Sequence, residues 1–270
     1  MFDYHVHSTF SADCDTPMEE SIKKAIETGL KEICFTDHID YDYPDRSIIF
    51  DLDLAQYNRK LTKLQEKYAK QITIKKGVEI GVQPHLLSRY SQLTASETFD
   101  FVICSMHTTN KQDLHSGEFF TDKSVDEAYT AYYNELLYCV KHYKQYQVLG
   151  HLDLVKRYTR ERATKGFREV IAEIFKVIIP EGKGIELNTS GVRYGLESGM
   201  PSADILKVYK EIGGEIITLG SDSHTSRTIA FQFNDALALL QTLGFRYITT
   251  FEKGKAKQHP IEGLSPLKLS

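Results

Sequence analysis

The chain has 270 residues and a mass of 30.9 kDa, and its 41% hydrophobic and 26% charged residues exclude a disordered or fibrous protein. The 33 Lys and Arg residues against 37 Asp and Glu give a net charge of −4, so the chain lacks the basic excess that wraps a nucleic-acid backbone. No apolar run approaches the roughly 20 residues of a membrane span, and no signal peptide opens the sequence, so we expect a cytoplasmic protein.

Short β-branched or aromatic runs alternate with helical patterns along the whole chain. The first strand, Phe2–His7, precedes a helix that begins near Pro17 and ends at Gly29, with Thr16 as its cap and Glu19 completing a capping box. Further strands are expected at Glu32–Thr36, Ile72–Ile80, Phe101–Met106, Gln147–Gly150, Gly184–Asn188, Glu215–Gly220 and Arg246–Thr250. Further helices are expected at Leu52–Gln71, Ser124–Tyr143, Phe167–Glu181, Ser202–Ile212 and Ile229–Leu243.

This alternation predicts parallel strands that are joined by right-handed crossovers. Seven or eight strand–helix units in a chain of this length favour a closed β/α barrel over an open sheet. We therefore expect a single α/β domain over residues 1–270 with the architecture of a TIM-like barrel.

Histidines and carboxylates gather at the ends of six of the predicted strands. His5 and His7 alternate on the first strand, so both imidazoles project to the same side. In a β/α barrel the C-terminal ends of the strands meet at one mouth, where catalytic groups belong. The other residues of this kind are, in chain order, His38, Glu79, His107, His151, Asp222 and His224.

Taken singly, each of these residues could satisfy a backbone group inside the fold. Taken together, the carboxylates would repel one another and the imidazoles would desolvate one another unless cations lay between them, so we predict a metal site. Imidazole and carboxylate ligands suit zinc, manganese or iron, and the sequence does not select among them. Asp37 and Asp153 follow or precede these histidines closely, and each could either orient an imidazole or cap a loop.

The series His5-x-His7, Thr36-Asp37-His38, Glu79, His107, His151 and Asp222-x-His224 resembles the polymerase and histidinol phosphatase family, in order, from residue 5 to residue 224. The resemblance implies a distorted (β/α)7 barrel with two or three divalent metal ions. It implies that His5, His7, Glu79 and Asp222 hold the first metal, and that Glu79, His107 and His151 hold the second, with Glu79 bridging. His38 and His224 match a third site, whose remaining position is Asp13; some relatives have histidine there, which leaves that site's metal and occupancy open.

With the segments Gly150–Leu154 and Glu186–Gly191, the same resemblance implies hydrolysis of a small phosphorylated substrate, L-histidinol phosphate, in histidine biosynthesis. A metal-bridging hydroxide is the expected nucleophile, and Glu79, Asp13 and His224 are the expected catalytic residues. Asp13 and His224 are the candidates that serve the leaving alkoxide.

Two arginines at the expected barrel mouth, Arg160 and Arg193, are predicted to bind the substrate phosphate, because the guanidinium fork matches phosphate oxygens. Each could instead be a solvated loop residue. Two other functions stay open. The first is a phosphoesterase that uses the same metals on nucleotides or on oligonucleotide 3′ ends, and the second is a metal-stabilised binding module without turnover. The oligomeric state is not fixed by the sequence.

Overall fold

The structure is a computed structural model that describes residues 1–159, 161 and 163–268. Its main sheet consists of parallel strands whose bounds follow the predicted runs closely, except for a short strand at His38–Ile39 that the sequence did not predict. These strands are β1 (Phe2–Val6), β2 (Glu32–Phe35), β3 (His38–Ile39), β4 (Thr73–Gly81), β5 (Phe101–Ser105), β8 (Val148–Leu149), β9 (Gly184–Asn188) and β10 (Ile217–Gly220).

The sheet curls into a nearly closed barrel. Its strand order is β1-β2-β4-β5-β8-β9-β10, and the short β3 pairs with the far end of β4. β1 and β10 meet at their C-terminal ends, where Val6 pairs with Ser223 and the amide of His7 donates to the Ser223 carbonyl at 2.9 Å. The predicted distorted seven-stranded barrel in one α/β domain is thereby confirmed.

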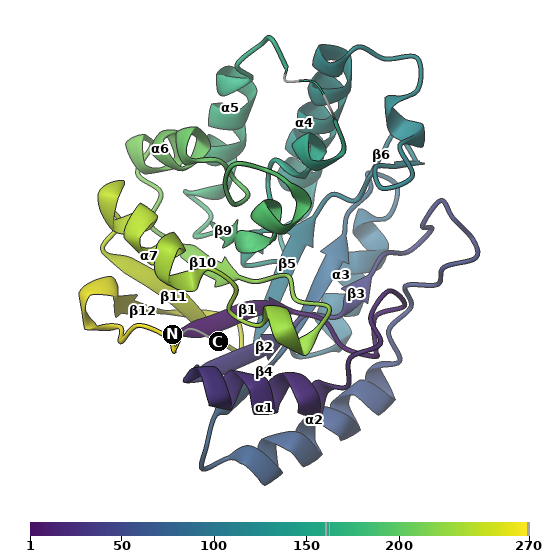
Figure 1. The fold of residues 1–270 in the computed structure, drawn as a ribbon. Coiled ribbons are helices and arrows are strands. Elements are labelled where there is room, and N and C mark those ends of the chain that lie inside the picture. Colours follow the sequence, from purple (N-terminus) through teal and green to yellow (C-terminus); the bar gives the residue numbers. More distant parts are fainter. Residues whose placement is uncertain (160, 162, 269–270) are drawn as a thin grey trace.

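Helices cover the outside of the barrel (Figure 1). They are α1 (Met18–Thr28), α2 (Leu54–Tyr68), α3 (Leu87–Ser96), α4 (Val125–His142), α5 (Arg168–Ile178), α6 (Ala203–Glu211) and α7 (Phe233–Thr242). The pattern predicted all of them except α3. Their apolar faces pack on the barrel strands in one continuous hydrophobic core, which holds the strands in register.

The last predicted strand forms, but it does not join the barrel. β11 (Tyr247–Glu252) pairs antiparallel with β12 (Lys255–Pro260), and this hairpin lies beside the N-terminus in Figure 1. Phe251 packs with Tyr4, Phe101 and Val148 inside the barrel. Phe101 and Val148 are the first residues of β5 and β8. The hairpin therefore covers the N-terminal end of the barrel, opposite the strand ends that carry the histidines.

The start of α1 differs from the prediction. Pro17 takes the N-cap position with no side-chain cap, so the predicted capping box is wrong. The Thr16 hydroxyl instead donates to the His224 carbonyl at 2.9 Å, and Glu19 contacts Lys67 at 2.5 Å. Thr16 therefore ties the start of α1 to the loop that carries His224. The predicted helix end at Gly29 is confirmed, with φ of 89°.

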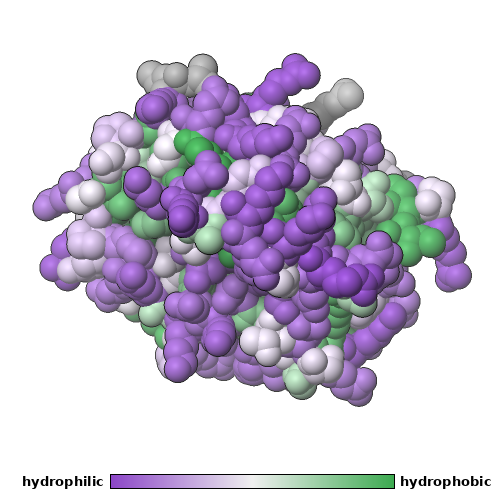
Figure 2. Space-filling model, turned by 90° about the horizontal axis from the view of Figure 1, so that it is seen from below, coloured by the Kyte–Doolittle hydropathy of each residue, from purple (hydrophilic) through white to green (hydrophobic). Residues whose placement is uncertain are grey.

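The outer surface is mostly polar. The face shown in Figure 2 is dominated by hydrophilic side chains, and apolar ones appear on it in small groups. Within the part of the chain that the structure describes, no helix combines the length and the apolar character needed to cross a membrane.

Candidate metal centre

Four side chains from three strand ends form a first group at the barrel mouth. His5 and His7 project from β1 and the residue that follows it, and their Nε2 atoms lie 3.0 and 3.4 Å from Glu79 Oε2. Asp222, two residues after the end of β10, places Oδ1 3.7 Å from His5 Nε2 and 3.4 Å from His7 Nε2. These are the four residues for which the resemblance implied a common metal, and they converge on one point.

The other oxygen of Glu79 faces a second group. Its Oε1 lies 3.2 Å from His107 Nε2 and 2.9 Å from His151 Nε2. The Ser105 hydroxyl donates to the same oxygen at 2.6 Å, so Ser105 fixes the carboxylate, while the neighbouring Cys104 points away into the hydrophobic core. One carboxylate therefore has its two oxygens aimed at two separate sets of imidazoles, which is the geometry of a bridging ligand.

A third group lies at the outer edge of this cluster. Asp13 Oδ2 is 3.2 Å from His224 Nε2 and 3.7 Å from His38 Nε2. The ring of His7 stacks between those of His38 and His224, with centroid distances of 4.4 and 4.1 Å. The Asp13 side chain is 42% exposed, so this group, unlike the other two, is open to solvent.

The buried atoms of this cluster have the pattern of an unsatisfied coordination site. Glu79 Oε2, His5 Nε2, His7 Nε2 and His38 Nδ1 are buried and have no hydrogen-bond partner. A folded protein rarely leaves buried polar atoms unpaired, because each one costs a desolvation free energy. Nitrogen and carboxylate donors within 4.8 Å of one another fit divalent cations in both size and ligand chemistry.

The electrostatics of the cluster show how strongly its groups interact. Burial would lower the pKa values of His5 and His107, but the carboxylates of Glu186 and Glu79 beside His5, and of Asp40 and Glu79 beside His107, raise both well above the ordinary value, so metal binding would release protons from these two imidazoles. Burial would raise the pKa of Glu79, but the imidazoles of His5, His107 and His38 hold it well below its ordinary value. Burial, reinforced by the neighbouring His224 and His38, lowers the pKa of His7 to about 3. An ionised carboxylate beside a neutral imidazole is the protonation state that metal coordination requires.

Glu186, on β9, supports both inner groups. Its Oε1 accepts a hydrogen bond from His5 Nδ1 at 2.6 Å, and its Oε2 accepts one from the backbone amide of His151 at 2.9 Å. A side chain at Gly220 would leave no room for it, since a Cβ there would lie 1.9 Å from Glu186 Oε1. Sequence reasoning gave Glu186 no role, although a carboxylate inside the buried strand Gly184–Asn188 was an available signal.

Asp40 was also missed, and it orients His107 by accepting a hydrogen bond from Nδ1 at 2.7 Å. Asp37 does not contact the His38 imidazole. It accepts hydrogen bonds from Ser8 and Ser11, and Ser11 in turn accepts from His7 Nδ1 at 3.1 Å. Of the two alternatives that the sequence left open for Asp37, the loop cap is the one observed.

Asp153 is a loop residue too. Its Oδ2 lies 2.7 Å from Lys156 Nζ and accepts from the Ser202 amide at 3.1 Å, with no contact to the His151 imidazole among the described residues. Of the other histidines, His85 pairs with the exposed Asp42 at 3.3 Å, in keeping with the local role expected of a loop histidine.

A cavity of about 320 Å³ opens over the metal centre. Aromatic side chains form much of its wall, together with one arginine, Arg157, from the 3₁₀ helix Leu154–Tyr158. The Arg157 guanidinium carbon lies 3.1 Å from the ring centroid of Tyr194, and its Nε is buried without a hydrogen-bond partner. Apart from the histidines of the three groups, the aromatic residues of the lining are Tyr43, Phe50, His115, Tyr158 and Tyr194.

The two arginines predicted from sequence have different outcomes. Arg160 lies outside the described residues. Arg193 donates from its two terminal nitrogens to the carbonyls of Ser221 and Asp222, each at 2.8 Å, and it is absent from the described lining of the cavity. Arg193 therefore positions the segment that carries Asp222, and its contact with phosphate stays a prediction. Arg157, three residues before Arg160 in the sequence, does line the cavity, and sequence reasoning did not single it out.

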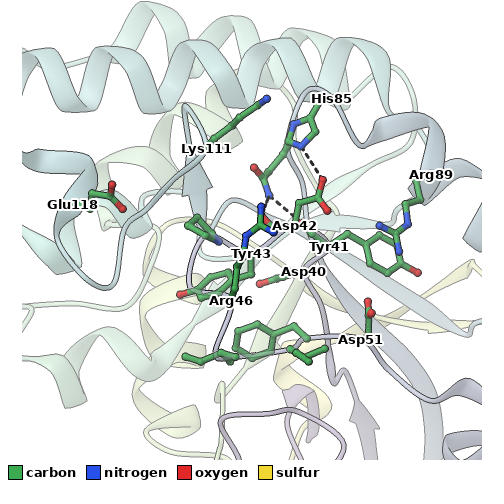
Figure 3. A pocket seen from close by; sticks show the side chains of 15 residues that line it. Asp40, Tyr41, Asp42, Tyr43, Arg46, Asp51, His85, Arg89, Lys111 and Glu118 are labelled. Atoms are coloured by element: carbon green, nitrogen blue, oxygen red, sulfur yellow. Dashed lines mark hydrogen bonds and ion pairs between the residues drawn. The ribbon is translucent and has the colours of Figure 1, made fainter.

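A second, more open cavity of about 760 Å³ adjoins the first, and Tyr43, Ile48 and Phe50 line both. Figure 3 shows Arg89 lying over the ring of Tyr41, at 3.4 Å from its centroid, and His85 reaching Asp42. The walls of this second cavity carry both acidic and basic side chains, so their charge does not indicate one class of ligand.

Comparison with known proteins gives a consistent result. The family model described as PHP domain matches residues 3–190. A histidinol-phosphatase of Lactococcus lactis is 34% identical over 92% of this chain and 93% of its own length, and a probable histidinol-phosphatase of Clostridium acetobutylicum is 30% identical over 94% and 97%. A crystal structure of the Lactococcus lactis histidinol phosphate phosphatase, complexed with zinc, L-histidinol and phosphate, superimposes with a TM-score of 0.83 and covers 95% of this chain and 98% of that one.

Proposed function

The chain belongs to the PHP-domain family, and we propose that within this family it hydrolyses L-histidinol phosphate to L-histidinol and inorganic phosphate. Two observations together support this proposal: the geometry of the candidate metal centre and the similarity to a histidinol-phosphatase. The imidazoles and carboxylates at the barrel mouth converge around Glu79, in a chain that matches a histidinol-phosphatase along nearly its whole length. By this proposal the enzyme is a phosphoric monoester hydrolase of histidine biosynthesis. We propose that it acts in the cytoplasm and that its catalytic domain spans residues 1–270.

The ligand assignment is part of the same proposal. Glu79 joins His5, His7 and Asp222 around one divalent ion, and it joins His107 and His151 around a second. Asp13, His38 and His224 take a third. Zinc, manganese and iron all suit these donors, and zinc is the ion in the Lactococcus lactis structure. Such ions supply Lewis acidity and activate water for attack on phosphorus at neutral pH.

The residues around the ions have separate tasks. Ser105 and the surrounding imidazoles keep Glu79 ionised and fixed, so the two inner groups stay in register. We assign protonation of the leaving alkoxide to the pair Asp13 and His224, whose Oδ2 and Nε2 lie 3.2 Å apart at the open edge of the cluster. This placement suits a group that meets the departing alcohol, since both residues line the cavity and the Asp13 side chain is 42% exposed.

We propose that Arg157 binds the phosphate oxygens that the metals do not contact. A phosphate monoester carries about two negative charges, and the guanidinium keeps its charge at every relevant pH. Stacking on Tyr194 fixes its plane, and the side chain lines the same cavity as the metal ligands. Arg160 and Arg193 stay predictions for the same task.

A substrate screen with defined metal content tests the proposed function. Protein stripped with a chelator and reconstituted separately with zinc, manganese or iron is assayed for phosphate release from L-histidinol phosphate, nucleoside monophosphates and an oligonucleotide with a 3′ phosphate. We expect the highest kcat/KM for L-histidinol phosphate and no release by stripped protein. A higher kcat/KM for the nucleotides would replace the proposal by the nucleotide phosphoesterase alternative.

A further inference from the structure

One carboxylate in the wall of the metal-centre cavity is not accounted for by the metal centre. Four of the five acidic residues that line the cavity have an imidazole within 3.4 Å of a carboxylate oxygen. These four are Asp13, Asp40, Glu79 and Asp222. The fifth, Asp113, has no such contact with a histidine ring among the described residues, so the ligand cluster does not explain its presence.

Among the described residues, the side-chain and backbone donors that hold the Asp113 carboxylate in place are all neutral. Asp113 ends β7 (Gln112–Asp113), which pairs with β6 (Thr108–Thr109) directly after His107. The residue is only 4% exposed. Its Oδ1 accepts from the Tyr43 hydroxyl at 2.8 Å and from the His115 amide at 2.9 Å, and its Oδ2 accepts from the Ser116 amide at 2.7 Å.

A buried carboxylate normally has a cationic partner, because burying an unpaired charge is costly. Within the described residues, no lysine, arginine or histidine side chain forms an ion pair with Asp113. Two carboxylate oxygens offer about four acceptor positions, and three are used, which leaves one on Oδ2. Among the described residues Asp113 thus has no cationic partner, and it presents an acceptor in the cavity wall to a cation that enters from solvent.

We propose that Asp113 binds the cationic amino group of the substrate and so makes the enzyme selective for phosphate esters of amino alcohols. This assignment rests on the proposed function and extends it to the part of the substrate that is not phosphate. The cavity then has two ends. Metals and Arg157 hold the dianionic phosphate at one end, and Asp113 holds the ammonium at the other. Tyr158 lies between the two ends, because its ring contacts both the Arg157 guanidinium and the ring of His115. The backbone amide of His115 in turn donates to Asp113.

The variant Asp113→Asn tests this assignment, because it removes the charge and keeps the shape. Dissociation constants of L-histidinol and of inorganic phosphate are measured by calorimetry on the metal-loaded variant and on wild-type protein. We expect the dissociation constant of L-histidinol to rise about tenfold to a hundredfold, the range for loss of a charge-assisted hydrogen bond, and that of phosphate to change less than about twofold. In turnover, KM for L-histidinol phosphate should rise far more than kcat falls.

Asp42→Asn is the matched control. Asp42 lies in the neighbouring cavity with its side chain 58% exposed, and asparagine tolerates its positive φ of 54°, so the same charge is lost near the same mouth without strain. Both dissociation constants should stay at the wild-type values in this variant.

The outcomes separate the two proposals. If Asp113→Asn binds L-histidinol as tightly as wild type, or loses phosphate affinity to the same extent, Asp113 has no role in recognising the cation, and the proposed function is untouched. If wild-type protein neither binds L-histidinol nor hydrolyses its phosphate ester, both proposals are wrong. A misfolded Asp113→Asn variant is recognised by its loss of phosphate affinity together with a lowered thermal midpoint. In that case Asp113→Glu, which restores the charge, should recover the preference for L-histidinol over phosphate. If Asp113→Glu does not recover it, the assignment fails.

Discussion

His5 and Glu186 are joined by a fully buried hydrogen bond of 2.6 Å between Nδ1 and Oε1. The second oxygen of Glu186 accepts from the backbone of His151, so one side chain orients a residue of the first inner group and anchors a residue of the second. This contact couples the two groups from behind, on the side opposite Glu79.

The first prediction concerns this coupling. Glu186→Gln keeps the size of the side chain but weakens its hold on the His5 imidazole, and loss of such a supporting contact costs about tenfold to a hundredfold in metal affinity. Titration of stripped protein against a chromophoric chelator measures the affinity directly. Glu215→Gln, at an exposed position before β10, is the control and should match wild type. Equal affinities in both variants would show that Glu186 does not orient His5.

The second prediction concerns Glu79. Glu79→Ala removes the carboxylate whose two oxygens face the two inner groups, so bound metal should fall by at least one ion per chain and turnover by orders of magnitude. Elemental analysis after dialysis gives the metal content, and circular dichroism checks the fold. A Glu79→Ala protein with full metal content and full activity would contradict the bridging assignment.

The third prediction concerns Arg157. If its guanidinium holds the phosphate, Arg157→Ala should lower kcat/KM by about 2–4 kcal/mol of transition-state stabilisation, with Arg157→Lys intermediate because lysine keeps the charge without the fork. Metal content should stay at the wild-type value. Tyr194→Phe keeps the ring beneath the guanidinium and serves as the control, with little loss expected.

The fourth prediction separates two roles for Arg193. Its hydrogen bonds to the carbonyls of Ser221 and Asp222 predict that Arg193→Ala displaces Asp222 and lowers metal affinity together with activity. A direct phosphate contact would instead lower kcat/KM with metal content unchanged. Metal titration and kinetics on the same preparation distinguish these results.

The fifth prediction concerns the nucleophile. No serine or cysteine is among the described residues that line the metal-centre cavity, so water should attack phosphorus directly. A single turnover in ¹⁸O-water should place the label in the released phosphate, and a chiral thiophosphate ester should react with inversion. Net retention would indicate a covalent phosphoenzyme.

The strands and the inner ligands were predictable because each depends on local pattern. Alternation on β1 puts His5 and His7 on one side, and residues just past a parallel strand end must meet at the barrel mouth. The resemblance then sorted these residues into groups that the structure brings together.

The supporting residues were not predictable, because their roles depend on how the closed barrel brings strands together. Glu186 reaches His5 across the closing strands, 181 positions away, and nothing in its local sequence specifies that contact. Thr16 has the local signature of a helix cap, but the nearby carbonyl of His224, 208 positions away, accepts its hydroxyl instead. Similarly, β11 has a strand pattern typical of a barrel, yet it pairs with β12, because the gap between β1 and β10 is already bridged.

The pairing of β1 with β10 also determines when the site can be completed during synthesis. The Asp3 side chain accepts a hydrogen bond from the amide of Ser221, which lies 218 positions later in the chain. The two strands are therefore synthesised far apart in time, and His5 and His7 leave the ribosome long before Asp222 is made. Glu79, His107 and His151 lie between these ends, and their strands β4, β5 and β8 are consecutive neighbours. A nascent chain can therefore assemble the second ion's ligands first. The sites of the first and third ions, which need Asp222 and His224, close last, in a slow step that must bring distant segments together. Arrested nascent chains of increasing length should accordingly gain affinity for one ion first, and for the other two only once the segment after β10 that carries Asp222 and His224 has emerged.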